Sequence, residues 1–92
     1  MPGSEFLFRV HGTSKLITMS ELVTRMNEII AEQVQRDFAV IDEIALAAMN
    51  DMLERFEEKT RVEVFDANLI NRGSPNTTLG NMTIADAIKK FN

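Results

Sequence analysis

The sequence predicts an α+β fold: a short N-terminal strand, two long helices, a second strand, a polar loop and a short C-terminal helix. Two segments alternate apolar and polar side chains, and the long stretch between them, 19 to 59, has no Gly or Pro. At 92 residues, with 45% hydrophobic and 26% charged residues, the chain has room for one small domain.

The first strand is predicted at the N-terminus, where Phe6, Phe8 and Val10 alternate with Leu7 and Arg9 before a polar turn. Residues 3 to 6 also match what two adjacent restriction sites encode when read in frame. We therefore expect residues 1–6 to be a cloning remnant and 7–92 to form a single dimerisation or interaction domain.

A helix is predicted to begin near Met19. Thr18 and Glu21 have the spacing of a capping box, in which each residue satisfies a free N–H group of the other's backbone. Ile17 and Leu22 stand where a hydrophobic staple packs across the helix start.

Apolar residues then recur in steps of three and four as far as Phe56, which indicates helix throughout. One unbroken helix of that length would reach about 60 Å, so we favour two helices and keep the single helix as the alternative. Asp37 is the expected N-cap of a second helix beginning at Phe38. Acidic residues lie four positions before Arg25, Arg36 and Arg55, as on a solvated helix face.

The segment 38 to 56 is apolar around most of its circumference, and a helix of that kind needs cover on nearly every side. A chain this small offers little cover, so we expect an intertwined homodimer. The predicted interface consists of Phe38, Ile41, Ile44, Ala45, Ala48, Met49, Met52, Leu53 and Phe56.

A second strand is predicted from Arg61 to Phe65 by alternation, and it is followed by a turn-rich loop over 68–81. Loops often carry binding residues, so Arg72, Ser74 and Asn76 are candidates for contacting a partner. Thr83 and Asp86 have capping spacing and predict a short C-terminal helix.

Composition limits the chemistry. The chain has no Cys, a single His at position 11, and four glycines in neither of the common phosphate-binding spacings. We therefore expect no enzyme, cofactor or metal site. A net charge of -4 argues against nucleic acid as the main partner, and the lack of a signal-like start or a long apolar run leads us to expect a cytoplasmic protein with no membrane partner.

Three segments together resemble the HU/IHF family of bacterial nucleoid proteins: residues 18–22 opening the first helix, 61–64 after the second, and Pro75-Asn76-Thr77 in the loop. The resemblance implies an intertwined dimer whose β arms clasp DNA. The chain departs from the family in its acidic charge, its extra first strand, its short arm, Ser74 in place of the Asn before Pro75, and the missing Gly-Phe-Gly turn.

Our main functional hypothesis is a non-enzymatic module for protein–protein interaction, assembly or regulation, which acts as a homodimer and engages another protein. An HU-like nucleic-acid-binding dimer and a subunit that contributes to a site between chains remain as alternatives.

Overall fold

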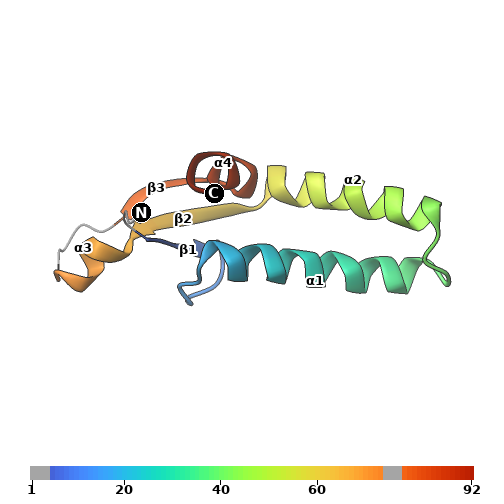
Figure 1. The fold of residues 1–92 in the computed structure, drawn as a ribbon, viewed down its shortest axis with the longest axis horizontal. Coiled ribbons are helices and arrows are strands. Elements are labelled where there is room, and N and C mark those ends of the chain that lie inside the picture. The colour runs from blue at the N-terminus through green and yellow to red at the C-terminus, as the bar shows by residue number, and fades with distance from the viewer. Residues whose placement is uncertain (1–4, 74–77) are drawn as a thin grey trace.

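The computed structural model describes residues 5–73 and 78–92. In chain order the elements are β1 (Phe6–Val10), α1 (Met19–Asp37), α2 (Glu43–Lys59), β2 (Arg61–Asp66), α3 (Ala67–Asn71), β3 (Thr78–Thr83) and α4 (Ile84–Phe91). The α+β class, the N-terminal strand and the C-terminal helix are as the sequence predicts. Figure 1 shows a sheet at one end and a helical hairpin extending from it.

The sheet is antiparallel, in the order β1-β2-β3. Phe8 pairs with Val64, and Val64 pairs in turn with Gly80, so β2 is the central strand. The outer edge of β1 is partly occupied by the chain's own loop, because Phe8 and Ile17 exchange two backbone hydrogen bonds of 2.8 and 2.9 Å.

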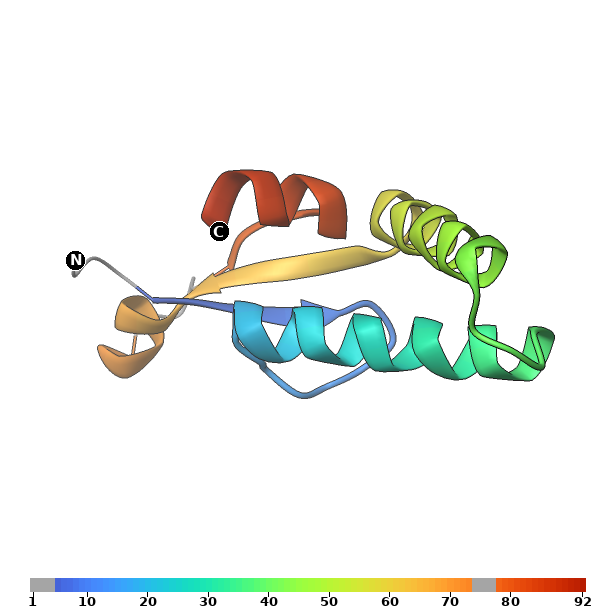
Figure 2. The ribbon, with the colours of Figure 1, turned by 45° about the vertical axis from the view of Figure 1, so that its right-hand side comes forward.

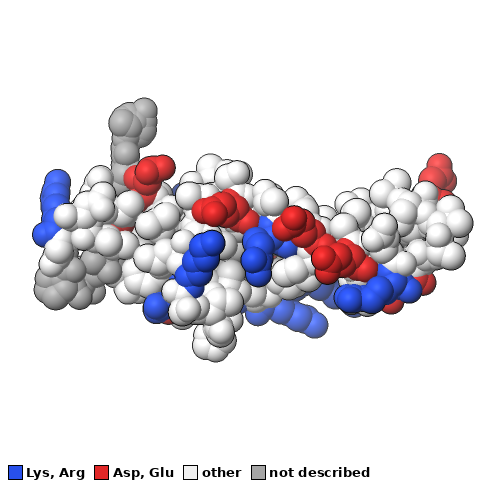
Figure 3. Space-filling model, turned by 90° about the horizontal axis from the view of Figure 1, so that it is seen from below, with Lys and Arg blue, Asp and Glu red and all other residues white. Residues whose placement is uncertain are grey.

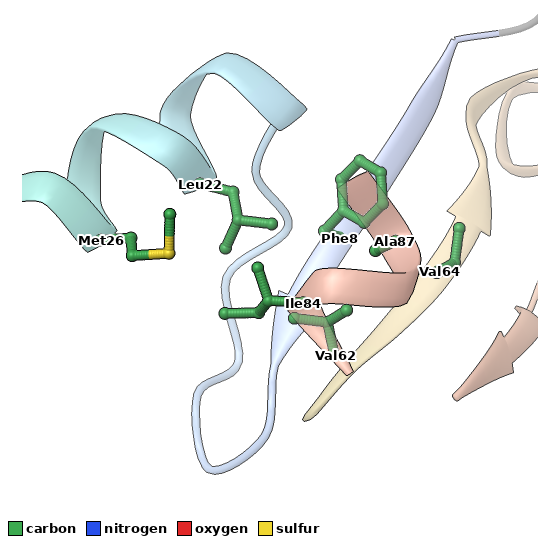
Figure 4. Close-up of a cluster of buried hydrophobic side chains, with 7 residues drawn as sticks. All are labelled: Phe8, Leu22, Met26, Val62, Val64, Ile84 and Ala87. Carbon is green, nitrogen blue, oxygen red and sulfur yellow. The ribbon is translucent and has the colours of Figure 1, made fainter. Parts of the chain in front are cut away.

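One face of the sheet carries the main core. Phe8, Val62 and Val64 point from β1 and β2 toward side chains of α1 and α4, as Figure 4 shows. The full buried set is Phe8, Leu22, Met26, Val62, Val64, Ile84 and Ala87. Phe91 adds an edge-on ring contact to Phe8, with centroids 6.1 Å apart. This core packs α1 and α4 against the same face of the sheet.

The two long helices form a hairpin, so the alternative of one continuous helix is wrong (Figure 2). The predicted cap is also wrong. The second helix begins at Glu43 rather than Phe38, and Asp42 rather than Asp37 caps it, accepting a 3.0 Å hydrogen bond from the Ala45 N–H. Phe38 ends α1 in an extended conformation, and residues 38–42 form the connection.

The start of α1 matches the prediction. The Glu21 N–H donates to the Thr18 hydroxyl at 3.1 Å, and the Thr18 N–H donates to the Glu21 carboxylate at 2.9 Å. The same logic holds at α4, where the Asp86 N–H donates to the Thr83 hydroxyl.

The prediction of a loop over 68–81 is wrong at both of its ends. Asp66 accepts a hydrogen bond from the Asn68 N–H and opens the short helix α3, while Thr78 begins β3. Turn-forming Asn, Gly and Pro residues dominate this segment and conceal the local cap and the strand that pairs with β2.

The chain is elongated, with extents of 50 × 28 × 17 Å. Its radius of gyration is 15.4 Å, whereas a compact domain of this length has a value of about 12 Å. The far half of the hairpin has no sheet beneath it (Figures 1 and 2). Its own small core, Ile30, Val34 and Ala45, is the only buried cluster in that half among the described residues.

Candidate self-association surface

The end of the hairpin exposes large apolar side chains. Val40 and Ile41 in the connection are 68% and 51% exposed, and Ile44 and Leu46 at the start of α2 are 71% and 48% exposed. We call residues 38–46 the hairpin tip. Single exposed apolar residues are ordinary on a protein surface, but a group of this size marks an interaction surface.

The predicted interface residues divide into three groups. Ile41 and Ile44 are exposed at the hairpin tip. Ala45 is fully buried within one chain and has no surface to offer a second copy. The remaining residues are half-buried, most of them against the hairpin core: Phe38, Ala48, Met49, Met52, Leu53 and Phe56.

Sequence reasoning missed Val40 and Leu46 as part of this surface. Both were included in the helical pattern, because continuous helix was expected from Phe38 onward. The signal that marks them is their position in the sequence. Val40 lies two residues before Asp42, the actual cap, and Leu46 lies four residues after it.

A hollow of about 430 Å³ lies beside the first half of α1. Apolar side chains from three elements line it, including Val10, Ile17, Ile29 and Phe56, and Lys15 and Arg25 are its cationic members. We call it the α1 groove. A shallower hollow lies at the other end of α1, where Arg36, Phe38 and Ile41 meet.

A row of charged side chains runs along α1 and lines both hollows, and Figure 3 shows it as red and blue patches along the helix. We call Glu21, Arg25, Glu28, Glu32 and Arg36 the α1 charged row; all five are exposed. At 100° per residue these positions fall within one narrow arc of the helix. Leu22, Met26, Ile30 and Val34 occupy the opposite, buried side.

The charged row forms no ion pair within the described residues, where the two ion pairs are Arg9–Glu63 and Arg55–Asp51. Glu21 is engaged at the helix start: the backbone N–H of Thr18, then its hydroxyl, hold the pKa of the Glu21 carboxyl below its usual value. Arg36 donates to the Gln33 side chain instead of to a carboxylate. The i,i+4 partners expected from the sequence therefore do not pair within α1.

The other sequence candidates are not gathered into a site. His11 is exposed at the end of β1, and no group of three or more potential metal ligands is found in the described ranges 5–73 and 78–92. Arg72 is exposed directly after α3. Ser74 and Asn76 lie outside the described residues.

None of the helices in the described part of the chain is long and apolar enough to cross a bilayer. A scan against protein-family models, a search of curated proteins and a search of solved structures find no match to this chain.

Proposed function

We propose that this protein is a non-enzymatic interaction module that acts as a homodimer, in which a second copy covers the hairpin tip. The observation that carries the proposal is the exposure of Val40, Ile41 and Ile44, each more than half open to solvent within one chain. Burying such side chains favours association by about 25 cal/mol per Å² of apolar surface removed from water.

The elongated shape supports the same proposal. In the far half of the hairpin the two helices pack only against each other and leave much of their surface in water, whereas most helical stability in proteins comes from tertiary packing of an apolar face. A second copy is the cover that the chain always has available, and twofold dimers are the commonest oligomers.

The experiment is light scattering behind size exclusion at two protein concentrations. We expect a species of roughly 21 kDa, twice the 10.4 kDa chain. The variant Ile41→Glu with Ile44→Glu places two carboxylates on the hairpin tip and is expected to be monomeric, because both positions are exposed within the chain and tolerate charge there.

Leu79→Glu is the matched control, since Leu79 is 46% exposed but lies on β3 in the sheet. It should leave the wild-type mass unchanged. A wild-type mass near 10 kDa at both concentrations would contradict the proposal, and so would a Leu79→Glu variant that is as monomeric as the Ile41→Glu, Ile44→Glu variant.

The alternative of nucleic-acid binding draws on the exposed Arg72 and on a shallow hollow where His11, Lys59 and Arg61 meet. A gel shift of a DNA duplex at low salt that weakens as salt is added would favour it. The alternative of a site between chains would be favoured by a ligand that raises the melting temperature of the dimer but not of the Ile41→Glu, Ile44→Glu variant.

A further inference from the structure

We propose that two copies associate through antiparallel packing of their α1 helices, held in register by the α1 charged row, with each hairpin tip directed to the α1 groove of the other. This inference rests on the proposed homodimer and specifies its geometry. It concerns a face that the sequence analysis assigned to solvent.

The charges of the row complement those of a second copy that runs in the opposite direction. In chain order its charges are negative at Glu21, positive at Arg25, negative at Glu28 and Glu32, and positive at Arg36. In an antiparallel pair whose twofold axis passes between positions 28 and 29, Glu21 faces Arg36 of the other copy and Arg25 faces Glu32. Symmetry repeats both pairs, so the interface has four opposite-charge pairs against one like-charge contact, between Glu28 and its own copy beside the axis.

The register is specific. Sliding one helix by four residues in one direction sets Glu21 opposite Glu32 of the other copy, which offsets the Arg25–Glu28 pairs formed there, and sliding it in the other direction brings Arg25 opposite Arg36. Like charges in juxtaposition disfavour an interface strongly, so complementary charges select one register and suppress the others.

Apolar contacts accompany the charges. Ile29, 43% exposed, stands beside the axis, where it lies level with Glu28 of the other copy and next to its own symmetry copy. The row spans about 22 Å from Glu21 to Arg36 at 1.5 Å per residue. The end of α1 at Asp37 therefore lies opposite the start of the other α1, and the hairpin tip beyond it lies opposite the segment before Met19.

That segment lines the α1 groove. Val10 and Ile17 supply apolar surface there, and Lys15 adds a positive charge. The hairpin tip presents the exposed Ile41 next to the acidic Asp42. At both ends of the proposed isologous contact, Ile41 and Asp42 thus meet apolar and cationic side chains, beside the anionic Glu21 and Glu28 that also line the groove.

The charges of Arg25 and Glu32 are available for this role, because α1 does not neutralise them, whereas the Glu21 carboxylate also accepts a hydrogen bond from the Thr18 N–H. Arg25 and Glu32 take part in neither of the two ion pairs of the described residues.

The test is charge reversal with rescue in trans. Arg25→Glu sets two pairs of like charges across the interface, and Glu32→Arg does the same with the opposite sign. We expect each variant alone to weaken dimerisation about tenfold or more, since two attractive pairs become repulsive.

Mixing the two variants restores opposite charges at both symmetry-related pairs, so a heterodimer of near wild-type affinity is expected. Rescue in trans cannot arise from changes within one helix. Arg72→Glu and Glu54→Arg are matched controls, because both residues are exposed and lie outside α1. Neither should change the affinity, and mixing them should have no effect.

A second readout uses the absence of cysteine from the chain. Ile29→Cys, beside the proposed axis, should give a disulfide-linked dimer on mild oxidation, whereas Glu54→Cys should not. A wild-type dimer that the reversals leave intact, or that is weakened without rescue on mixing, overturns this geometry while the proposed function stands. A wild-type monomer overturns both.

Discussion

Arg9 donates two hydrogen bonds to a single carboxylate oxygen of Glu63, from Nε at 3.1 Å and from Nη2 at 2.5 Å. The two residues are direct partners across β1 and β2. The same guanidinium lies 5.2 Å from the centroid of the Phe65 ring, which is only 7% exposed. Arg9 therefore joins two strands and covers an aromatic ring on the sheet face opposite the main core.

Replacing Arg9 by Ala is expected to lower the free energy of unfolding by about 1 kcal/mol, because a half-exposed ion pair and a cation–π contact are each worth less than about 1 kcal/mol. The free energy of unfolding of Arg9→Lys should lie between those of the wild type and Arg9→Ala, since an ammonium keeps the charge but not the pair of donors that a guanidinium offers. Urea denaturation measures the difference, with Arg72→Ala as the control. Equal stability of Arg9→Ala and the control would contradict this assignment.

The two candidate caps of the second helix can be separated by matched substitutions. Asp42→Ala should destabilise the fold by about 1 kcal/mol, because the Ala45 N–H loses its acceptor. Asp37→Ala removes only an exposed contact with Gln33 and should stay within about 0.5 kcal/mol of wild type. Thermal melts followed by circular dichroism report both changes. A larger loss of stability in Asp37→Ala than in Asp42→Ala would indicate that the second helix begins at Phe38.

Gly12 has a φ of 91°, in the region that side-chain-bearing residues avoid. Gly12→Ala is expected to destabilise the fold by about 1–2 kcal/mol through backbone strain alone, since no atom stands within 4 Å of the added methyl group. Gly80 is the matched control: its φ is not positive, and an added methyl would meet only the end of Met82, at 3.6 Å. Denaturation midpoints of the two variants should therefore differ clearly, and equal midpoints would contradict the strain.

The capping box at Thr18 makes the start of α1 sensitive to acid. Hydrogen bonds from the Thr18 backbone N–H and then its hydroxyl lower the pKa of Glu21. The stabilisation is therefore fully present above the carboxyl's ordinary pKa, and it is lost as pH falls through the lowered value. An NMR titration of the Glu21 carboxyl, with amide exchange of the first turn, follows this loss.

In Thr18→Ala the backbone N–H remains and the hydroxyl is missing, so the pKa of Glu21 should move only part of the way back toward its ordinary value. An unchanged titration curve in that variant would show that the hydroxyl does not contribute to holding the carboxylate.

Local signals account for much of the fold. The spacing of Thr18 with Glu21 and of Thr83 with Asp86 correctly located two helix starts, because a cap depends on residues only three positions apart. β3 was missed because its stability comes from pairing with β2 rather than from its own Gly- and Asn-containing sequence. The connection at Val40 and Ile41 was missed because apolar periodicity continues through it.

The candidate surface was predicted only in part. An apolar excess in residues 38–56 is visible in the composition. Which of these side chains are buried within one chain depends on how α2 packs against α1. Ala45 faces α1 and Ile44 does not, although they are neighbours. The charge order on α1 was equally visible, yet its meaning depends on the structure, where the i,i+4 partners do not pair.

The whole hairpin is inserted between two strands that pair with each other, so Arg9 and Glu63 meet across 54 positions. If the chain between them were disordered, closing that loop would carry an entropic penalty that grows as about (3/2)RT ln n. A hairpin formed first would bring the start of α1 and the end of α2 together and shorten the effective loop to residues 11–18 on one side and Thr60 on the other. The order of events during folding is thereby constrained: β1 can find β2 quickly only after the helices have turned back on each other, so substitutions at Asp42 should slow folding and substitutions at Arg9 should mainly speed unfolding.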